Sequence, residues 1–72
     1  MITQEQVNRL NRLLNKENSI YRLELIKTKR PRIHFRDIKG GLVRANLYFT
    51  TDKFEDLREF VRDSIDDEQS CW

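Results

Sequence analysis

The chain has 72 residues, of which 38% are hydrophobic and 36% are charged, and its formal net charge is +2. A chain of this length buries only about 60% of its unfolded surface, so we expect one thin core without a deep substrate pocket. No apolar run reaches the roughly 18 residues that a membrane span needs, and the polar start MITQEQ differs from a signal peptide. We therefore expect a single cytoplasmic domain over residues 1–72 that does not enter a membrane.

The charged residues are segregated along the chain. Residues 1–19 carry a charge of +1, and residues 20–45 carry +6 from eight basic and two acidic side chains. Residues 46–72 carry −5 from three basic and eight acidic side chains. Because a surface field depends on where charges cluster, this distribution indicates a basic surface in the middle of the chain and an acidic one at its end.

The first element is predicted to be a helix over residues 4–16. Thr3 precedes Gln6 by three residues, which is the spacing of a capping box. Asn18 follows at a position where a left-handed backbone conformation can end the helix. An apolar stripe with helical spacing runs along one side: Val7, Leu10 and Leu14.

The middle of the chain changes to a period of two, which is typical of half-buried strands. Three such strands are predicted, over residues 20–26, 32–37 and 43–50, and the Gly40-Gly41 pair indicates a hairpin turn between the last two. In the third strand, Leu47 and Phe49 are expected to face the core and Tyr48 the other side. Sequential strands with short connections form an antiparallel meander.

A second helix is predicted from the apolar stripe of Phe54, Leu57, Val61 and Ile65. Asp52 and Glu55 have capping-box spacing at its start. Carboxylates are unfavourable at the negative end of a helix dipole, so the acidic run that begins at Asp66 indicates that the helix ends near residue 65. Residues 66–72 are then expected to form an acidic tail.

The predicted order is helix, three strands, helix, which is an α+β fold. Because each strand offers one apolar face, both helices are expected on that face, in a two-layer sandwich. One core should therefore collect the apolar residues of every element, namely Leu10, Leu23, Phe35, Leu47, Leu57 and Val61. The opposite face of the sheet is left open.

Alternation along the strands predicts that this open face is basic and balanced by Glu24 alone. Arginine binds phosphate and carboxylate groups with two parallel hydrogen bonds and stacks on bases, and aromatic residues stack on bases as well. We therefore expect a small non-enzymatic module, a regulator or inhibitor, that binds nucleic acid or an acidic protein surface. The expected binding residues are Arg22, Lys29, Arg30, Arg32, His34, Arg36, Arg44, Asn46 and Tyr48.

Two alternatives remain open at this point. The acidic second helix and the tail could bind a protein partner, with Asp56, Glu59 and Asp63 as the contact residues, or the open face could form a homodimer. His34 and Cys71 are the only soft metal ligands and the only plausible catalytic pair, and they lie far apart in the sequence. We therefore expect no catalytic residues, no metal site and no cofactor, and we expect Cys71 to be a free thiol.

The order of elements resembles that of double-stranded RNA-binding domains, and the segment RPRIHF, residues 30–35, is similar to the Gly-Pro-x-His turn of that family. That family grips phosphates with a lysine cluster at the start of its second helix, whereas this helix opens with the acidic TTDKFEDL. The resemblance therefore extends to the outline of the fold and implies no function. Size and element content also resemble those of small phage-encoded inhibitors of bacterial defence and host enzymes.

Overall fold

The computed structural model describes residues 1–70, and Cys71 and Trp72, with the predictions made for them, lie outside the described residues. The α+β order of the elements is confirmed, and their bounds are as follows. The elements are α1 (Gln4–Lys16), β1 (Tyr21–Ile26), β2 (Arg32–Asp37), β3 (Leu42–Phe49) and α2 (Phe54–Ser70).

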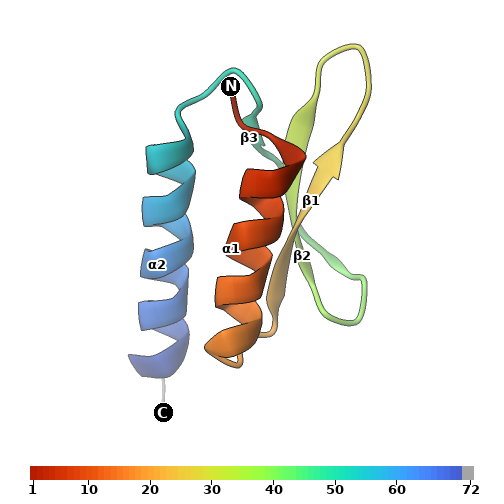
Figure 1. Ribbon diagram of the computed structural model, residues 1–72. Coiled ribbons are helices and arrows are strands. Elements are labelled where there is room, and N and C mark those ends of the chain that lie inside the picture. The colour runs from red at the N-terminus through yellow and green to blue at the C-terminus, as the bar shows by residue number, and fades with distance from the viewer. Residues whose placement is uncertain (71–72) are drawn as a thin grey trace.

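The three strands form one antiparallel sheet in the order β1-β2-β3, so β1 and β3 are its two edges. Both helices lie side by side on the same face of this sheet, and the β1–β2 loop projects beyond the sheet away from α2 (Figure 1). The two-layer arrangement predicted from the apolar alternation is therefore confirmed. The other face of the sheet carries no helix.

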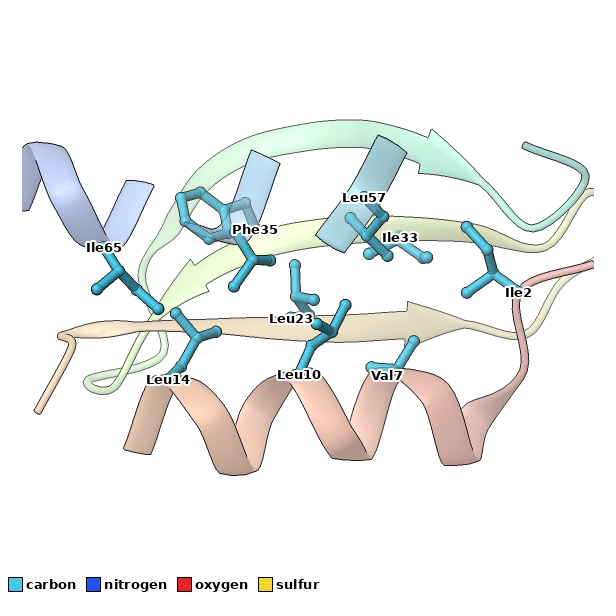
Figure 2. Packing of buried hydrophobic residues seen from close by; sticks show 10 residues of the cluster. Ile2, Val7, Leu10, Leu14, Leu23, Ile33, Phe35, Leu57 and Ile65 are labelled. Atoms are coloured by element: carbon cyan, nitrogen blue, oxygen red, sulfur yellow. The ribbon is translucent and has the colours of Figure 1, made fainter. Parts of the chain in front are cut away.

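The core lies between the helices and the sheet (Figure 2), and β3 adds to it only the partly buried Leu47 and Tyr48. Helix α1 supplies Val7, Leu10 and Leu14, whereas Leu57, Val61 and Ile65 come from α2. The strands contribute a smaller set of fully buried side chains, because the helices cover β1 and β2 more completely than β3. These are Leu23, Ile33 and Phe35.

Helix α1 begins and ends as its sequence predicts. The Thr3 hydroxyl accepts the Gln6 N–H and the Gln6 side chain accepts the Thr3 N–H, which completes the capping box. At the other end Asn18 has a φ of 57°, and the next N–H, that of Ser19, donates back to the Leu14 carbonyl. These caps fix the direction in which the chain enters β1.

Strand β3 differs from the predicted alternation because its register against β2 is irregular. Leu42 lies opposite Arg36 and Arg44 lies opposite Phe35, so β3 has one extra residue there and its side chains exchange faces. A second bulge follows around Asn46, which has a φ of 52°. Beyond it, Tyr48 lies opposite the core residue Ile33, and Phe49 lies opposite Arg32 on the open face. Cross-strand partners share a face, so the predicted orientations of Tyr48 and Phe49 are wrong and are exchanged in the structure.

Helix α2 extends to Ser70, five residues beyond the predicted end near residue 65. The Glu68 carboxylate accepts the Ser19 hydroxyl at 2.7 Å and the Ile20 N–H at 2.9 Å, so it binds the turn between α1 and β1. This tertiary contact outweighs the unfavourable position of the carboxylates at the end of the helix dipole. The prediction of an acidic tail from residue 66 is therefore wrong for the part of the chain that the structure describes.

We expect Leu57→Ala to lower the free energy of unfolding by about 2–5 kcal/mol, because the truncation leaves a cavity in the one core cluster that residues 1–70 form. Leu57 is fully buried, whereas Ile38 is 59% exposed and provides a control at which the same kind of truncation removes little buried area. Urea titration followed by circular dichroism measures both variants. Equal stability of Leu57→Ala and the wild type would contradict the position of α2.

Glu68→Gln should lower the free energy of unfolding by roughly 1–3 kcal/mol, because the amide NH₂ of glutamine cannot accept the second of the two hydrogen bonds. Asp67→Asn removes the same charge from a neighbouring exposed position of the same helix. Amide hydrogen exchange of residues 66–70 should accelerate in the first variant and not in the second. Identical exchange in both would show that Glu68 does not hold the end of α2.

Candidate functional site

The strand register arranges the open face in three rows across the sheet. One row contains Ile26, Arg32 and Phe49, the next contains Glu24 and His34, and the third begins with Arg22 and Arg36 and ends at Leu42. The face is therefore mixed: basic side chains lie beside large apolar ones, and Leu42 and Phe49 are 51% and 43% exposed.

Arg22 is used inside the molecule. Its guanidinium donates to the carbonyls of Ser19 and Tyr21, at 2.9 and 2.6 Å, and to the Asn15 side chain at 3.1 Å. It thereby closes the turn between α1 and β1. The structure thus gives this predicted binding residue a structural role.

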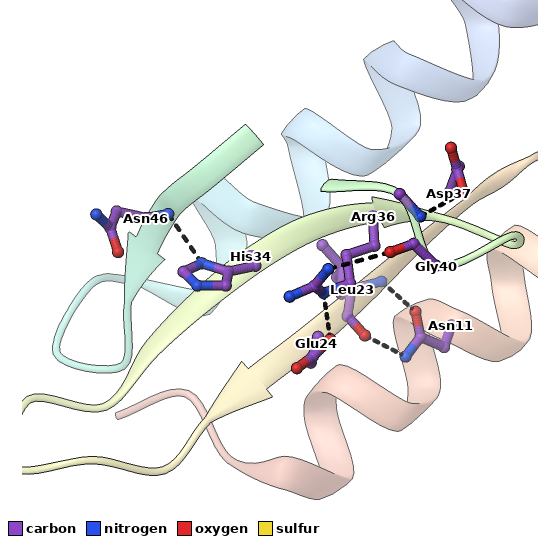
Figure 3. Close-up of polar contacts among 9 residues, drawn as sticks. Asn11, Leu23, Glu24, His34, Arg36, Asp37, Gly40 and Asn46 are labelled. Atoms are coloured by element: carbon purple, nitrogen blue, oxygen red, sulfur yellow. Dashed lines mark hydrogen bonds and ion pairs between the residues drawn. The ribbon is translucent and has the colours of Figure 1, made fainter. Parts of the chain in front are cut away.

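Arg36 is also engaged internally (Figure 3). Its Nε forms an ion pair with Glu24, and its terminal nitrogen donates to the Gly40 carbonyl at 3.2 Å. The same turn is held by Asp37, whose carboxylate accepts the N–H groups of Lys39 and Gly41. The charge of Arg36 is therefore offset by the one carboxylate that was expected on this face.

The centre of the open face is occupied by His34, which is half-buried. Its Nδ1 accepts the Asn46 N–H at 3.0 Å, across the bulge of β3 (Figure 3). This contact assigns the proton of the neutral ring to Nε2. The imidazole therefore anchors the bulged strand, and Asn46 presents its side chain to solvent.

The basic residues at the end of the sheet are in a different situation. Lys27, Lys29 and Arg30 lie in the β1–β2 loop and are exposed, and Arg32 is half-buried at the start of β2. Within residues 1–70, none of these four side chains forms an ion pair with a carboxylate. The Nε of Arg32 is buried without a hydrogen-bond partner. Four cations without a carboxylate partner thus lie together at this loop, which we call the basic hairpin (Lys27–Arg32).

Two of the predicted site residues lie away from this group. Arg44 is exposed, but its cross-strand partner is the core residue Phe35, which places it on the helix side of the sheet and not on the open face. Tyr48 packs on the same side, with its ring 6.3 Å from that of Phe60. The prediction that these two residues belong to the open face is wrong, because the register shift between Leu42 and Arg44 exchanges the faces of β3.

The acidic residues of the alternative prediction come together beside Tyr48. Asp56, Glu59 and Asp63 line one wall of a shallow groove of about 290 Å³ between α2 and β3, and Tyr48 and Phe60 also line it. We call it the acidic groove. Phe60 also packs against the core, and its ring and that of Tyr48 are both partly accessible in this groove.

Neither a metal centre nor a membrane segment is found in the described part of the chain. Among residues 1–70, no three His, Cys, Asp or Glu side chains are grouped so that they could hold a metal ion. Over the same residues, neither helix combines the length and the apolar character that a membrane span requires.

Comparison of the chain with protein families, with curated proteins and with solved structures finds no match. The function is accordingly inferred from the geometry of the surfaces described above.

If the role of Arg22 is structural, Arg22→Ala should lower the free energy of unfolding by roughly 1–3 kcal/mol, because it leaves carbonyl groups in the α1–β1 turn without a donor. Lys29→Ala removes a charge of the same sign from the basic hairpin and should leave stability unchanged. Thermal unfolding measures both variants. Equal melting temperatures for Arg22→Ala and the wild type would show that Arg22 has no structural role and is available for binding.

Proposed function

We propose that the protein is a small non-enzymatic binding module, a regulator or inhibitor, that binds the phosphate backbone of nucleic acid with its basic hairpin. The single observation that supports this is the division of the basic residues. Arg22 and Arg36 are engaged internally, whereas the cations of the basic hairpin have no carboxylate partner within residues 1–70. Side chains that are not neutralised by their own chain can release counterions from an anionic ligand.

The shape of the hairpin supports the same partner. Strands β1 and β2 are joined by a loop that projects from the end of the three-stranded sheet (Figure 1). The major groove of duplex DNA is about 12 Å wide, and it admits the tip of such an antiparallel hairpin. Lysine and arginine at the tip would contact phosphates on either side, and Phe49, exposed next to Arg32, offers an aromatic surface for an unpaired base.

An acidic protein surface is the other anionic partner that this charge distribution allows, and the test separates the two. A phosphate backbone presents a regular, dense array of charges, so its affinity falls linearly with salt on logarithmic axes, by about 0.9 per duplex phosphate neutralised or 0.7 per single-strand phosphate. An acidic protein would give a weaker dependence and a defined stoichiometry.

The experiment measures binding to a 20-base-pair duplex and to a 20-nucleotide single strand over a series of salt concentrations, by fluorescence anisotropy. The double variant Lys29→Glu, Arg30→Glu should abolish binding at low salt, and the neutral variant Lys29→Gln, Arg30→Gln should reduce the salt slope by about 2 if both residues contact phosphates. Circular dichroism should remain that of the wild type, because both side chains are exposed loop residues.

A matched control is available on the acidic helix. The variant Arg58→Glu, Arg62→Glu makes the same change in net charge at two exposed positions of α2. Its binding should be close to that of the wild type. If the two double variants lose affinity equally, only net charge matters and the basic hairpin is not the site. If the wild type binds neither nucleic acid at low salt, the proposed partner is wrong.

A further inference from the structure

The two edges of the sheet are protected to very different extents. At the β1 edge, the Asn11 side chain of α1 accepts the Leu23 N–H at 2.7 Å and donates to the Leu23 carbonyl at 2.9 Å (Figure 3). The amide thereby occupies the backbone groups that a further strand would need. Edges closed in this way do not accept another chain.

The β3 edge is closed at one end only. There the Phe49 N–H donates to the Asp52 carboxylate at 2.9 Å, and the Phe49 carbonyl accepts the Asp52 N–H. Asp52 therefore protects the edge and is not the helix cap that its spacing predicts, since α2 begins only at Phe54. The bulge at Asn46 ends the regular part of the strand on this side. The segment from Leu42 to Ala45 remains between the bulge and the turn.

Backbone directions in this segment follow from the β1 edge. The backbone N–H and carbonyl of Leu23 point away from β2, toward Asn11. The backbone groups of its partner Phe35 therefore point toward β3, and those of Arg44, opposite Phe35, point back toward β2. Ala45 then directs its backbone groups outward. Leu42 does so as well, because its partner Arg36 points toward β1, and Val43 is the extra residue that the register shift between Phe35 and Arg36 places between Leu42 and Arg44. Val43 and Leu42 are also 49% and 51% exposed, which makes this a free and apolar edge.

On the helix side of this edge, the chain carries both a cation, Arg44, and a group of carboxylates, those of the acidic groove. Arg44 stands on the helix side of β3, exposed, and within residues 1–70 it forms no ion pair. The acidic groove opens beside the same strand, with three carboxylates and two aromatic rings among its lining residues. A guanidinium in such a groove gains both ion pairing and cation–π contact.

We propose that β3 pairs antiparallel with β3 of a second copy of this chain, so that Leu42–Ala45 of the two copies form the centre of a continuous six-stranded sheet. In this two-fold arrangement, Arg44 of each copy enters the acidic groove of the other, and Leu42 and Val43 of both copies are covered. A second copy fits because one surface carries the strand, the cation and the anionic acceptor, as a self-complementary two-fold interface requires.

Sedimentation equilibrium of the purified chain, up to about 1 mM, tests the proposal. The wild type should be dimeric. Arg44→Glu should weaken the dimer at least about tenfold, because a buried carboxylate would face the acidic groove. Arg12→Glu, an exposed position on α1, makes the same charge change and should not weaken it. Ala45→Pro, which removes an outward N–H from the free edge, should also weaken the dimer.

A mixing experiment assigns the contact. Arg44→Glu combined with the triple variant Asp56→Lys, Glu59→Lys, Asp63→Lys should form a heterodimer more readily than either forms a homodimer. A chain that stays monomeric throughout the concentration range overturns the proposal, and so does a dimer that neither Arg44→Glu nor Ala45→Pro weakens. The variant Lys29→Glu, Arg30→Glu should leave the dimer intact, so failure of the nucleic-acid proposal and failure of this one are distinguishable.

Discussion

Burial of a single face of the sheet is the constraint on which the rest of this structure depends. Within residues 1–70, the ten buried apolar side chains lie in one cluster between the helices and the sheet, and no second layer covers the other face. The backbone polar groups at the edges of the sheet are therefore left to side chains, to water or to partners. Asn11 at the β1 edge and Asp52 at the end of β3 are side chains that bind such edge groups.

The same constraint divides the charged residues into two groups. Arg22 and Arg36 face each other across β1 and β2, where like charges are unfavourable. Each is turned toward acceptors within the chain, one toward the α1–β1 turn and the other toward Glu24 and Gly40. Their charges thus stabilise connections between elements. Among the basic residues of the strands and of the β1–β2 loop, those of the basic hairpin and Arg44 have no such acceptor within residues 1–70 and are left for intermolecular contacts.

Local signals account for most of what could be predicted from the sequence. The capping box at Thr3, the left-handed residue Asn18 and the period of two in β1 and β2 all depend on neighbours within a few residues, and each is confirmed. Five of the six residues expected in the core are buried there, and the sixth, Leu47, is half-buried against it.

The wrong predictions concern segments whose conformation depends on residues far away in the sequence. The register shift between Leu42 and Arg44 reverses the faces of Tyr48 and Phe49, and the second bulge, at Asn46, is bound by His34 twelve positions earlier. The long α2 depends on Glu68 contacting a turn nearly fifty residues away. Neither contact leaves a periodic signal in the sequence. The acidic groove was missed for the same reason, because it exists only when Tyr48 faces the helices.

The two proposed surfaces also resolve an electrostatic conflict within this chain. Helix α2 carries seven acidic and two basic residues, a field that opposes the approach of any polyanion to the helix layer. In the antiparallel dimer, each acidic groove receives an arginine and lies near the centre of the assembly. The two basic hairpins, at the Phe49 end of each β3, then lie at opposite ends of the continuous sheet. Pairing through β3 would therefore cover the acidic groove, which repels a polyanion, and leave the two basic hairpins of the dimer exposed to bind one.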